Sequence, residues 1–175
     1  MSVIDTVYAA GDDALQYEWQ VTFGTIPYLD TTTDFNVRCS NVDIPTASVG
    51  TYTVDWKSEN FNKPNGKVTT PKQFSITFRV DKAWKVYQAF LGWNHAIVNP
   101  STGGTAIDSN LGISTIRTPV TVTTGYYNTD GTFTATGQVW NFTGCWPQEV
   151  GNPTLDNASG DPATTTITIQ FLEML

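Results

Sequence analysis

Few residues in the chain have side chains that could carry out catalysis. The single histidine, His95, follows Asn94 at the expected end of a helix, where a histidine most often contacts the last carbonyl groups. Cys145 and His95 could in principle act as a nucleophile and its base. However, Cys145 lies between Gly144 and a Trp-Pro turn, and the sequence shows no third group that would orient the base. We therefore do not expect Cys145 and His95 to form a catalytic pair.

The other reactive residue types also lack a pattern. Asp12 and Asp13 are the only adjacent acid pair, and they fall in an expected N-terminal arm, residues 1–16. Cys39 and Cys145 have neither the spacing of metal ligands nor a disulfide framework, so two reduced, buried thiols are the plainest account. No phosphate-binding glycine loop is present. We predict that the protein is not an enzyme, and we expect no cofactor and no metal ion.

The elements that would position functional residues are mainly strands. The chain has 175 residues, of which 39% are hydrophobic and only 14% charged, which suits one domain over residues 1–175. No run is apolar and long enough to cross a bilayer, and the N-terminus is a poor secretory signal because it lacks Lys and Arg. Alternation of apolar and polar residues predicts strands over 17–26, 35–40, 49–56, 74–80, 116–124, 139–145 and 164–172.

One amphipathic helix is expected directly after the strand at 74–80. Asp81 is a candidate N-cap, and Gly92 and Asn94 are candidate stop signals. The apolar stripe of this helix should comprise Ala83, Trp84, Tyr87, Phe90 and Leu91. We therefore predict a mainly β fold, a β-sandwich or barrel of about seven strands with one α-helix.

Two turns and one long hairpin complete the expected chain course. Residues 51–72 are read as a hairpin that protrudes from the body, with its reversal at Pro64-Asn65-Gly66; the alternative is a disordered loop. A second reversal is expected at Asn128-Thr129-Asp130-Gly131, and Gly144-Cys145-Trp146-Pro147 should break the strand at 139–145. An isolated hairpin is marginally stable in water, so a protruding one suggests a partner surface.

Charge is distributed unevenly along the chain. Residues 57–85 hold seven bases and two acids, a net charge of +5, whereas the remainder holds two bases and fourteen acids, a net charge of −12. This pattern can be a solvated basic hairpin on an acidic protein, or a molecule with opposite electrostatic faces that stacks head to tail. Specific nucleic-acid binding is not expected of an acidic chain with no stacking platform.

At the level of motifs, the chain resembles the tail tube proteins of contractile-tailed bacteriophages, of the T4-like type. These are related in fold to the tube subunits of pyocins and type VI secretion systems. The most specific element is the turn GCWPQEVG at 144–151, followed by Leu155-Asp156 and the terminal strand 166–171. The other elements are the first strand at 14–23, Ile44-Pro45, Asn65-Gly66, and the strand and helix with Trp84, Phe90 and Trp93.

The resemblance implies a subunit of hexameric rings that stack into a hollow tube inside a contractile sheath. The partners implied are other copies of the chain and the sheath, tape measure, baseplate and tail terminator proteins. Phage DNA would pass through without specific binding, no membrane would be contacted, and the location would be the virion tail, assembled in the host cytoplasm. The alternatives are a tube subunit of a type VI-like or extracellular contractile injection system, and a carbohydrate-binding β-sandwich module.

Two sets of site residues follow as hypotheses. The hairpin would contact the neighbouring ring, with its lysines on the acidic surface of the next subunit, through Lys57, Glu59, Lys63, Asn65, Lys67 and Lys72. The polar faces of two strands are candidates to line the lumen, where acids would keep DNA from the wall: Glu18, Gln20, Thr22, Thr166, Thr168 and Gln170. Those faces could equally point toward the sheath.

Overall fold

A computed structural model describes residues 18–26, 38–105, 116–153, 155 and 160–175. The N-terminal arm predicted over 1–16 lies outside the described residues, as does the first half, 35–37, of the strand predicted over 35–40. The elements in chain order are β1 Trp19–Phe23, β2 Cys39–Asp43, β3 Ser48–Trp56, β4 Glu59–Thr69, β5 Gln73–Arg79, α3 Lys85–Ile97, β6 Thr118–Tyr127, β7 Phe133–Val150, β8 Thr164–Gln170 and β9 Glu173–Met174.

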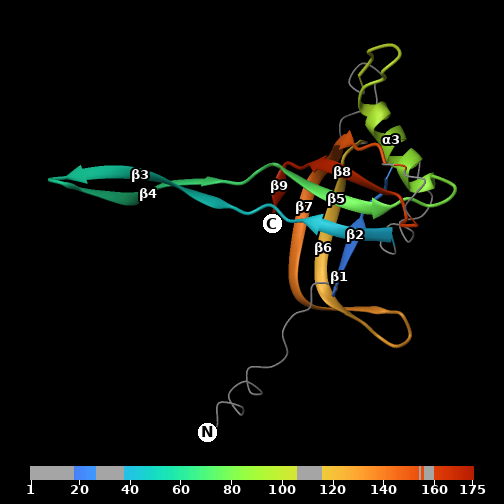
Figure 1. The fold of residues 1–175 in the computed structure, drawn as a ribbon, viewed down its shortest axis with the longest axis horizontal. Helices are drawn as coiled ribbons and strands as arrows, with labels where there is room; N and C mark the ends of the chain where they lie inside the picture. Colours follow the sequence, from blue (N-terminus) through green and yellow to red (C-terminus); the bar gives the residue numbers. More distant parts are fainter. Residues whose placement is uncertain (1–17, 27–37, 106–115, 154, 156–159) are drawn as a thin grey trace, which may run out of the picture.

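The main sheet has seven antiparallel strands and curls around one core. Its order is β1-β6-β7-β8-β5-β2, and β9 pairs with β7 beside this path (Figure 1). The mainly β fold with one helix and a long hairpin is therefore confirmed. A closed barrel is not: among the described residues no pairing joins β1 to β2, so the two ends of the path leave an open seam.

The core is built by strand alternation. On β5, Phe74, Ile76 and Phe78 are buried while the residues between them face outward, and β8 repeats the pattern with Ile167 and Ile169. Aromatic rings dominate the contacts; the rings of Phe74 and Phe142 stack with centroids 4.4 Å apart. Each such side chain contributes about 1.5–3 kcal/mol through burial, so the alternation determines which face of each strand points inward.

The start of α3 follows the predicted cap. The backbone N–H groups of Lys85 and Val86 donate to the carboxylate of Asp81 at 3.2 and 3.3 Å. Burial acts to raise the pKa of Asp81, but these hydrogen bonds outweigh it and hold the pKa below its ordinary value. Trp84 takes a left-handed conformation with φ of 57° just before the helix, so Ala83 and Trp84 precede the helix and do not belong to its stripe.

The predicted end and stripe of the helix are wrong. Gly92 and Asn94 lie inside α3, which ends at Ile97. Trp93, between them, is fully buried, and its indole N–H donates to the Ile116 carbonyl at 2.6 Å. Tertiary packing thus continues the helix past two residues that often end one. Its buried face comprises Val86, Ala89, Phe90 and Trp93, of which only Phe90 was predicted.

Strand β7 continues through the predicted break. Gly144 has φ of +61°, a backbone conformation that glycine adopts at little cost, so the strand bends there without ending. The pairing changes directly after the bend: residues up to Cys145 pair with β6, and residues from Trp146 onward pair with β8. The bend therefore lets one strand serve both halves of the curled sheet.

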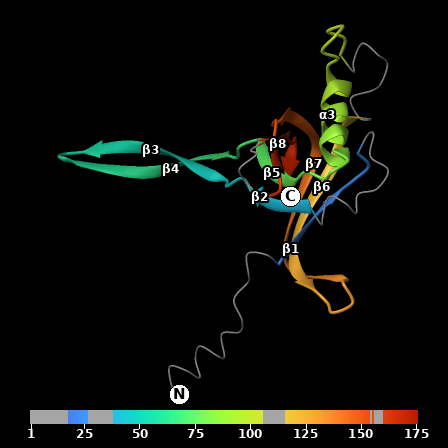
Figure 2. The same ribbon diagram turned by 45° about the vertical axis from the view of Figure 1, so that its right-hand side comes forward.

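The long hairpin consists of β3 and β4 and extends far from the body in both ribbon views (Figure 1, Figure 2). Its reversal is at Lys57-Ser58, where Lys57 has φ of 57°, and not at Pro64-Asn65-Gly66. The latter residues lie within β4 opposite a register shift between Val49 and Thr51. The Asn65 side chain accepts from the Lys67 N–H at 2.9 Å, so this turn chemistry forms a bulge in a continuing strand.

The second hairpin, between β6 and β7, reverses at the predicted residues. The Asn128 carbonyl accepts from the Gly131 N–H at 2.9 Å, and Asp130 accepts from the Thr132 N–H at 2.8 Å. The pKa of Asp130 is lowered, mainly because the Thr132 hydroxyl donates to its carboxylate at 2.6 Å and also because the Thr132 N–H donates to it. Among the described residues, no helix has the length and apolar character needed to span a membrane.

Candidate assembly surface

The residues considered for catalysis are not brought into a catalytic arrangement. Cys145 is buried in the core, and burial raises the pKa of its thiol to about 12, so it stays protonated. His95 is exposed on α3. The described part of the chain holds no group of three or more His, Cys, Asp and Glu residues able to bind a metal ion, and Asp12 and Asp13 lie outside it.

The β3–β4 hairpin is the most exposed ordered region that the structure describes. Every residue of β4 is exposed, as are most of β3. Cross-strand pairing places Tyr52, Val54, Trp56 and Phe61 on one face, because Val54 is paired with Phe61 and the other two alternate with polar residues. The exposed fractions are 50% for Tyr52, 66% for Trp56 and 47% for Phe61. We call these four residues the apolar stripe.

The opposite face of the hairpin is polar and internally bonded. It carries Thr53 and Asn62, whose side chains form a hydrogen bond at 2.9 Å, as well as Asp55 and Asn60. One face is thus satisfied in water, while the other exposes large hydrophobic groups next to one another. Contiguous exposed apolar surface of this kind marks interaction sites in soluble proteins, and a free two-stranded hairpin gains little stability by itself.

The predicted inter-ring residues fall into two groups. Lys57 lies in the turn, Glu59 and Lys63 share the face of the apolar stripe, and Asn65 and Lys67 lie at the bulge. Lys72 is not on the hairpin: its Nζ donates to the Leu172 carbonyl at 3.0 Å and lies 5.8 Å from the centre of the Phe171 ring.

The structure also divides the basic segment. Between Ser48 and Thr69 the hairpin holds three lysines, and Asp55 and Glu59 oppose them, so its net charge is only +1. The remaining bases of the segment lie on the body. The hairpin is therefore less positively charged than the basic segment 57–85 as a whole, and apolar residues dominate one of its faces. Alternation over residues 52–56 was the signal for that face in the sequence.

The lumen candidates occupy outward faces on two halves of the sheet. Gln20 and Thr22 of β1 alternate with the buried Val21 and Phe23, and they are paired with Thr123 and Thr121 of β6. Glu18 immediately precedes β1. The other three candidates, Thr166, Thr168 and Gln170, lie on β8 and alternate with its buried residues. Strands β6 and β7 separate β1 from β8, so the structure does not bring the six residues together.

A polar layer covers the outer face of β8, β5 and β2. Thr166 and Thr77 share a hydroxyl hydrogen bond at 3.0 Å, and Ser75 donates to Asp43 at 2.8 Å. Gln170 donates to the side chains of Gln73 and Gln148 at 3.2 and 2.6 Å. These cross-strand hydrogen bonds make a flat, wet face held in register, which suits a wall in contact with water.

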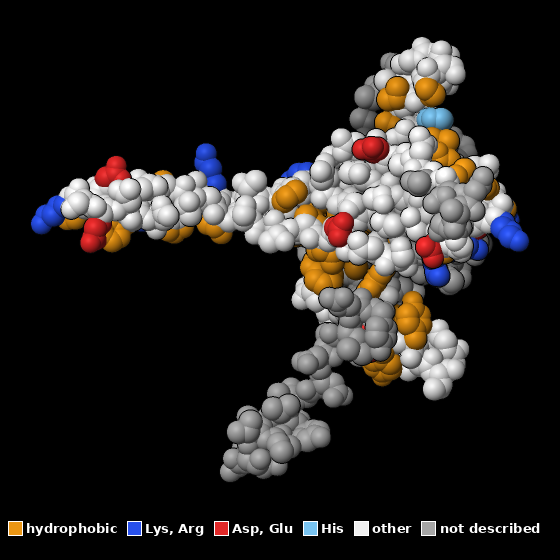
Figure 3. All heavy atoms as spheres, viewed as in Figure 1, with side chains coloured by type: hydrophobic (Ala, Val, Ile, Leu, Met, Phe, Trp, Pro, Cys, Tyr) orange, Lys and Arg blue, Asp and Glu red, His pale blue; other side chains and the backbone are white. Residues whose placement is uncertain are grey.

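Charged and hydrophobic side chains are distributed differently over the hairpin and the body. Figure 3 shows the hairpin with basic and acidic groups near its tip and hydrophobic groups along one edge. The body carries scattered charges, and further hydrophobic groups lie toward the lower β6–β7 hairpin, where Tyr126 and Tyr127 are exposed. Exposed hydrophobic groups thus gather on the two hairpins of the described residues.

Comparison with known proteins finds similarity in fold but no similarity to a protein-family model or a curated protein. No protein-family model matches the chain, and no curated protein matches it. Solved structures do match. One is a chain of the PVC sheath–tube complex of an extracellular contractile injection system in the extended state, with a TM-score of 0.59 and 16% identity. The match covers 100% of this chain and 97% of that one.

Two further structures agree with it. A chain of the PVC sheath/tube terminator in the extended state matches with a TM-score of 0.58 and 15% identity, over 94% of this chain and 96% of that one. A chain of the anti-feeding prophage baseplate, 6-fold symmetrised, matches with a TM-score of 0.56 and 13% identity, over 94% and 95%. The family resemblance drawn from the sequence is therefore confirmed at the level of the fold.

Proposed function

We propose that this protein is the tube subunit of a contractile injection machine, in which six copies form a ring and rings stack into a hollow tube inside a sheath. The matched chains come from assemblies described as a sheath–tube complex, a terminator and a 6-fold baseplate. Sheath, terminator and baseplate proteins are accordingly the partners that we assign, besides other copies of this chain.

The observation that carries the proposal is the exposed apolar stripe on a hairpin that leaves the body. A monomer gains nothing from exposing Tyr52 and Trp56 on an unsupported hairpin. A stacked assembly buries them at every contact between copies. The edges of β1 and β2, which have no strand partner among the described residues, agree with this, because open strand edges are aggregation-prone unless another chain or element covers them.

Negative-stain electron microscopy of the purified protein tests the proposal directly. Rings or tubes over a range of protein concentrations are the expected result. A monodisperse monomer at all concentrations would overturn it. If that monomer bound glycans, the carbohydrate-binding alternative would stand, although only Trp56 among the described tryptophans is exposed enough to stack on a sugar.

Within this class, we propose two candidate machines. One is a bacteriophage tail, whose tube conducts DNA, and the other is an extracellular injection system. The sequence motifs favour the first, and the assemblies to which the matched chains belong favour the second. In the phage form, the net charge of −7 per chain would keep DNA from adhering to the wall. Genes for a capsid and tape measure protein beside this gene would decide for the phage, and their absence from a complete cluster would decide against it.

The electrostatic part of stacking has its own test. Replacing Lys57, Lys63 and Lys67 by Glu changes the hairpin charge from +1 to −5 and leaves the apolar stripe in place. We expect shorter or fewer tubes and intact rings, as counted by microscopy. Tubes of normal length from this variant would show that charge does not direct stacking.

A further inference from the structure

The β3–β4 hairpin contains Asn65-Gly66, the only Asn-Gly step in the sequence. Both residues are exposed. Gly66 has φ of +74°, and no atom lies within 4 Å of the position where a Cβ would stand. The backbone at Gly66 is therefore open to the approach of a neighbouring group, as a residue without a side chain allows.

The regular pairing of β3 with β4 is interrupted at this step. Val49 is paired with Val68, and Thr51 with Pro64, so residues 65–67 stand opposite Gly50 alone. A bulge disrupts the ladder locally and lets its residues take conformations that a regular strand does not. The backbone here thus has the freedom that a reaction between two neighbouring residues requires.

The side-chain amide of Asn65 is held in a defined position. Its Oδ1 accepts from the Lys67 N–H at 2.9 Å. The amide also lies against Gly50, where an added Cβ would stand 2.6 Å from Nδ2 and 2.7 Å from Oδ1. An N–H that donates to Oδ1 stabilises the negative charge that develops on this oxygen when a nucleophile adds to Cγ. The hydrogen bond therefore makes Cγ a better electrophile.

We propose that Asn65 is a site of spontaneous deamidation, in which the backbone nitrogen of Gly66 is the nucleophile and water the second reactant. The nitrogen gives its proton to a solvent base and forms a bond to Cγ of Asn65. The bond between Cγ and Nδ2 breaks, and ammonia leaves with a proton from solvent. Water then opens the cyclic succinimide at either carbonyl, which leaves aspartate or isoaspartate at position 65.

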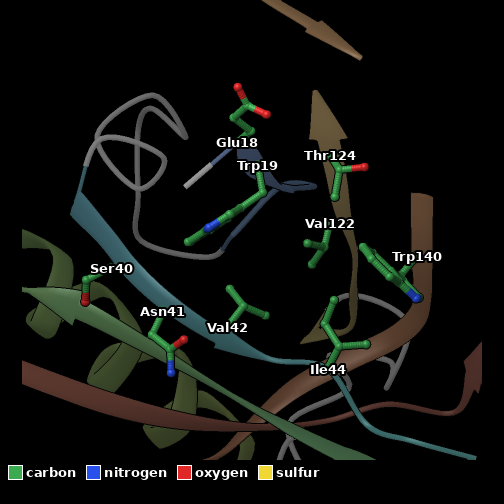
Figure 4. A pocket seen from close by; sticks show the side chains of 9 residues that line it. All are labelled: Glu18, Trp19, Ser40, Asn41, Val42, Ile44, Val122, Thr124 and Trp140. Carbon is green, nitrogen blue, oxygen red and sulfur yellow. The ribbon is translucent and has the colours of Figure 1, made fainter. Parts of the chain in front are cut away.

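Two other described asparagines lack the glycine. In the same hairpin, Asn62 also accepts a hydrogen bond at Oδ1, from the Thr53 hydroxyl at 2.9 Å, but Lys63 follows it. In the body, Asn41 of β2 is followed by the β-branched Val42, and Figure 4 shows both beside the hollow between β1 and β2. A side chain on the following residue hinders attack by its nitrogen, so both asparagines should react more slowly.

Deamidation changes the charge and the backbone of the hairpin. A carboxylate at position 65 lowers the net charge of residues 48–69 from +1 to 0. Isoaspartate also adds a methylene group to the backbone of β4. The change falls on the surface that we place against another copy, so deamidated chains should assemble less well. This consequence rests on the proposed function, whereas the reaction itself does not.

Peptide mapping by mass spectrometry tests the reaction. The full-length protein is incubated in mildly alkaline buffer and sampled over days. Trypsin then releases residues 58–67 as one peptide, because proline follows its one internal lysine. This peptide carries Asn60, Asn62 and Asn65, which are thus compared in one spectrum. We expect conversion of the amide to the acid mainly at Asn65, and equal conversion at all three would overturn the proposal.

Two glycine variants separate the effect of the bulge from that of the dipeptide. Gly50 does not have a positive φ, so Gly50→Ala adds no backbone strain and only pushes the Asn65 amide from the Lys67 N–H. The rate at Asn65 should fall about threefold or more. An unchanged or higher rate would contradict the role of the bulge.

Gly66→Ala instead places a Cβ beside the nucleophile. It should lower the rate at Asn65 about tenfold or more. A rate equal to that of the parent would overturn the assignment of the Gly66 nitrogen. Both glycine variants should keep the circular dichroism spectrum of the parent, which controls for loss of the fold.

Sedimentation of partly deamidated protein tests the consequence for assembly. After assembly, the pellet should be enriched in the unmodified peptide and the supernatant in the deamidated one. Equal proportions in the two fractions would overturn the effect on assembly. Absence of a pellet from fresh protein would instead refute the proposed function, while conversion at Asn65 in the same sample would still support the reaction.

Discussion

Strands β5 and β3 show the same alternation of apolar and polar residues, but the apolar side chains of β5 are buried and those of β3 are exposed. On β5, Phe74, Ile76 and Phe78 are at most 3% exposed. On β3, Tyr52 and Trp56 recur with the same period and are at least 50% exposed. The difference is that β8 and α3 complete a core around β5, whereas β4 alone accompanies β3. Alternation thus shows which face of a strand is apolar. It does not show whether residues of the same chain pack against that face.

The largest effect on folding should come from truncation in the body. Phe78 is fully buried and lies 5.3 Å from the Phe90 ring, centroid to centroid. Phe78→Ala should lower the free energy of unfolding by about 3–5 kcal/mol, because it removes buried apolar surface and leaves a cavity. Urea unfolding monitored by circular dichroism measures it. A loss below about 1 kcal/mol would mean that the body is packed no more tightly than the hairpin.

Substitution at the bend of β7 should have the next largest effect. Gly144→Ala places a Cβ on a residue with φ of +61°, only 2.6 Å from Cδ1 of Leu172. The exposed Leu172 side chain can move, so the cost should be about 1–2 kcal/mol, mostly from the left-handed backbone. The same urea measurement detects it. Gly66→Ala, also at positive φ but in the hairpin with no atom near its Cβ, is the matched control for the effect of backbone strain alone.

Loss of the helix cap should have a smaller effect. Asp81→Ala removes the acceptor for the N–H groups of Lys85 and Val86 and should lower the free energy of unfolding by about 0.5–2 kcal/mol. Because the pKa of Asp81 is lowered in the folded chain, its contribution is present above the unfolded pKa of about 3.9 and is lost as the pH falls through the folded value.

The pH dependence separates the cap from general destabilisation. The stability difference between the parent and Asp81→Ala should be full at pH 7 and should shrink in acid, as measured by thermal unfolding across that range. A difference that stays constant down to strongly acidic pH would show that the carboxylate charge does not contribute to the cap.

The smallest effect on folding, and a large one on assembly, should come from the hairpin. Trp56→Ser should change the free energy of unfolding by less than about 0.5 kcal/mol, since the side chain is exposed in the isolated chain. Loss of an interface anchor of about 2 kcal/mol or more should raise the concentration needed for assembly more than tenfold. Sedimentation measures the second quantity. Thr53→Ser, on the polar face, should leave both unchanged.

Most of the fold was predictable from the sequence because its signals are local. Alternation marked the strands β1, β3, β5 and β8, and Asp81 marked the helix start. The errors arose where tertiary contacts decide the outcome. Gly92 and Asn94 do not end α3, because Trp93 packs between them. Pro64-Asn65-Gly66 forms a bulge, because Val68 and Thr69 return to pairing with β3.

The candidate site was predictable only in part. Alternation placed Tyr52, Val54 and Trp56 on one face, and the resemblance to tube proteins directed attention to the hairpin. The sequence could not show that Lys72 contacts Leu172 and Phe171 of the body, since that contact joins residues a hundred positions apart. It also could not show that, among the described residues, β1 and β2 end the sheet path without pairing with each other.

The bend at Gly144 has a mechanical consequence. Strand β7 pairs with β6 up to Cys145 and with β8 from Trp146 onward, so the two sheet halves share one unbroken strand of 18 residues. Neither half can slide against the other unless a row of backbone hydrogen bonds on β7 shears at once. A force applied along β7 is therefore shared by the hydrogen bonds of both sheet halves.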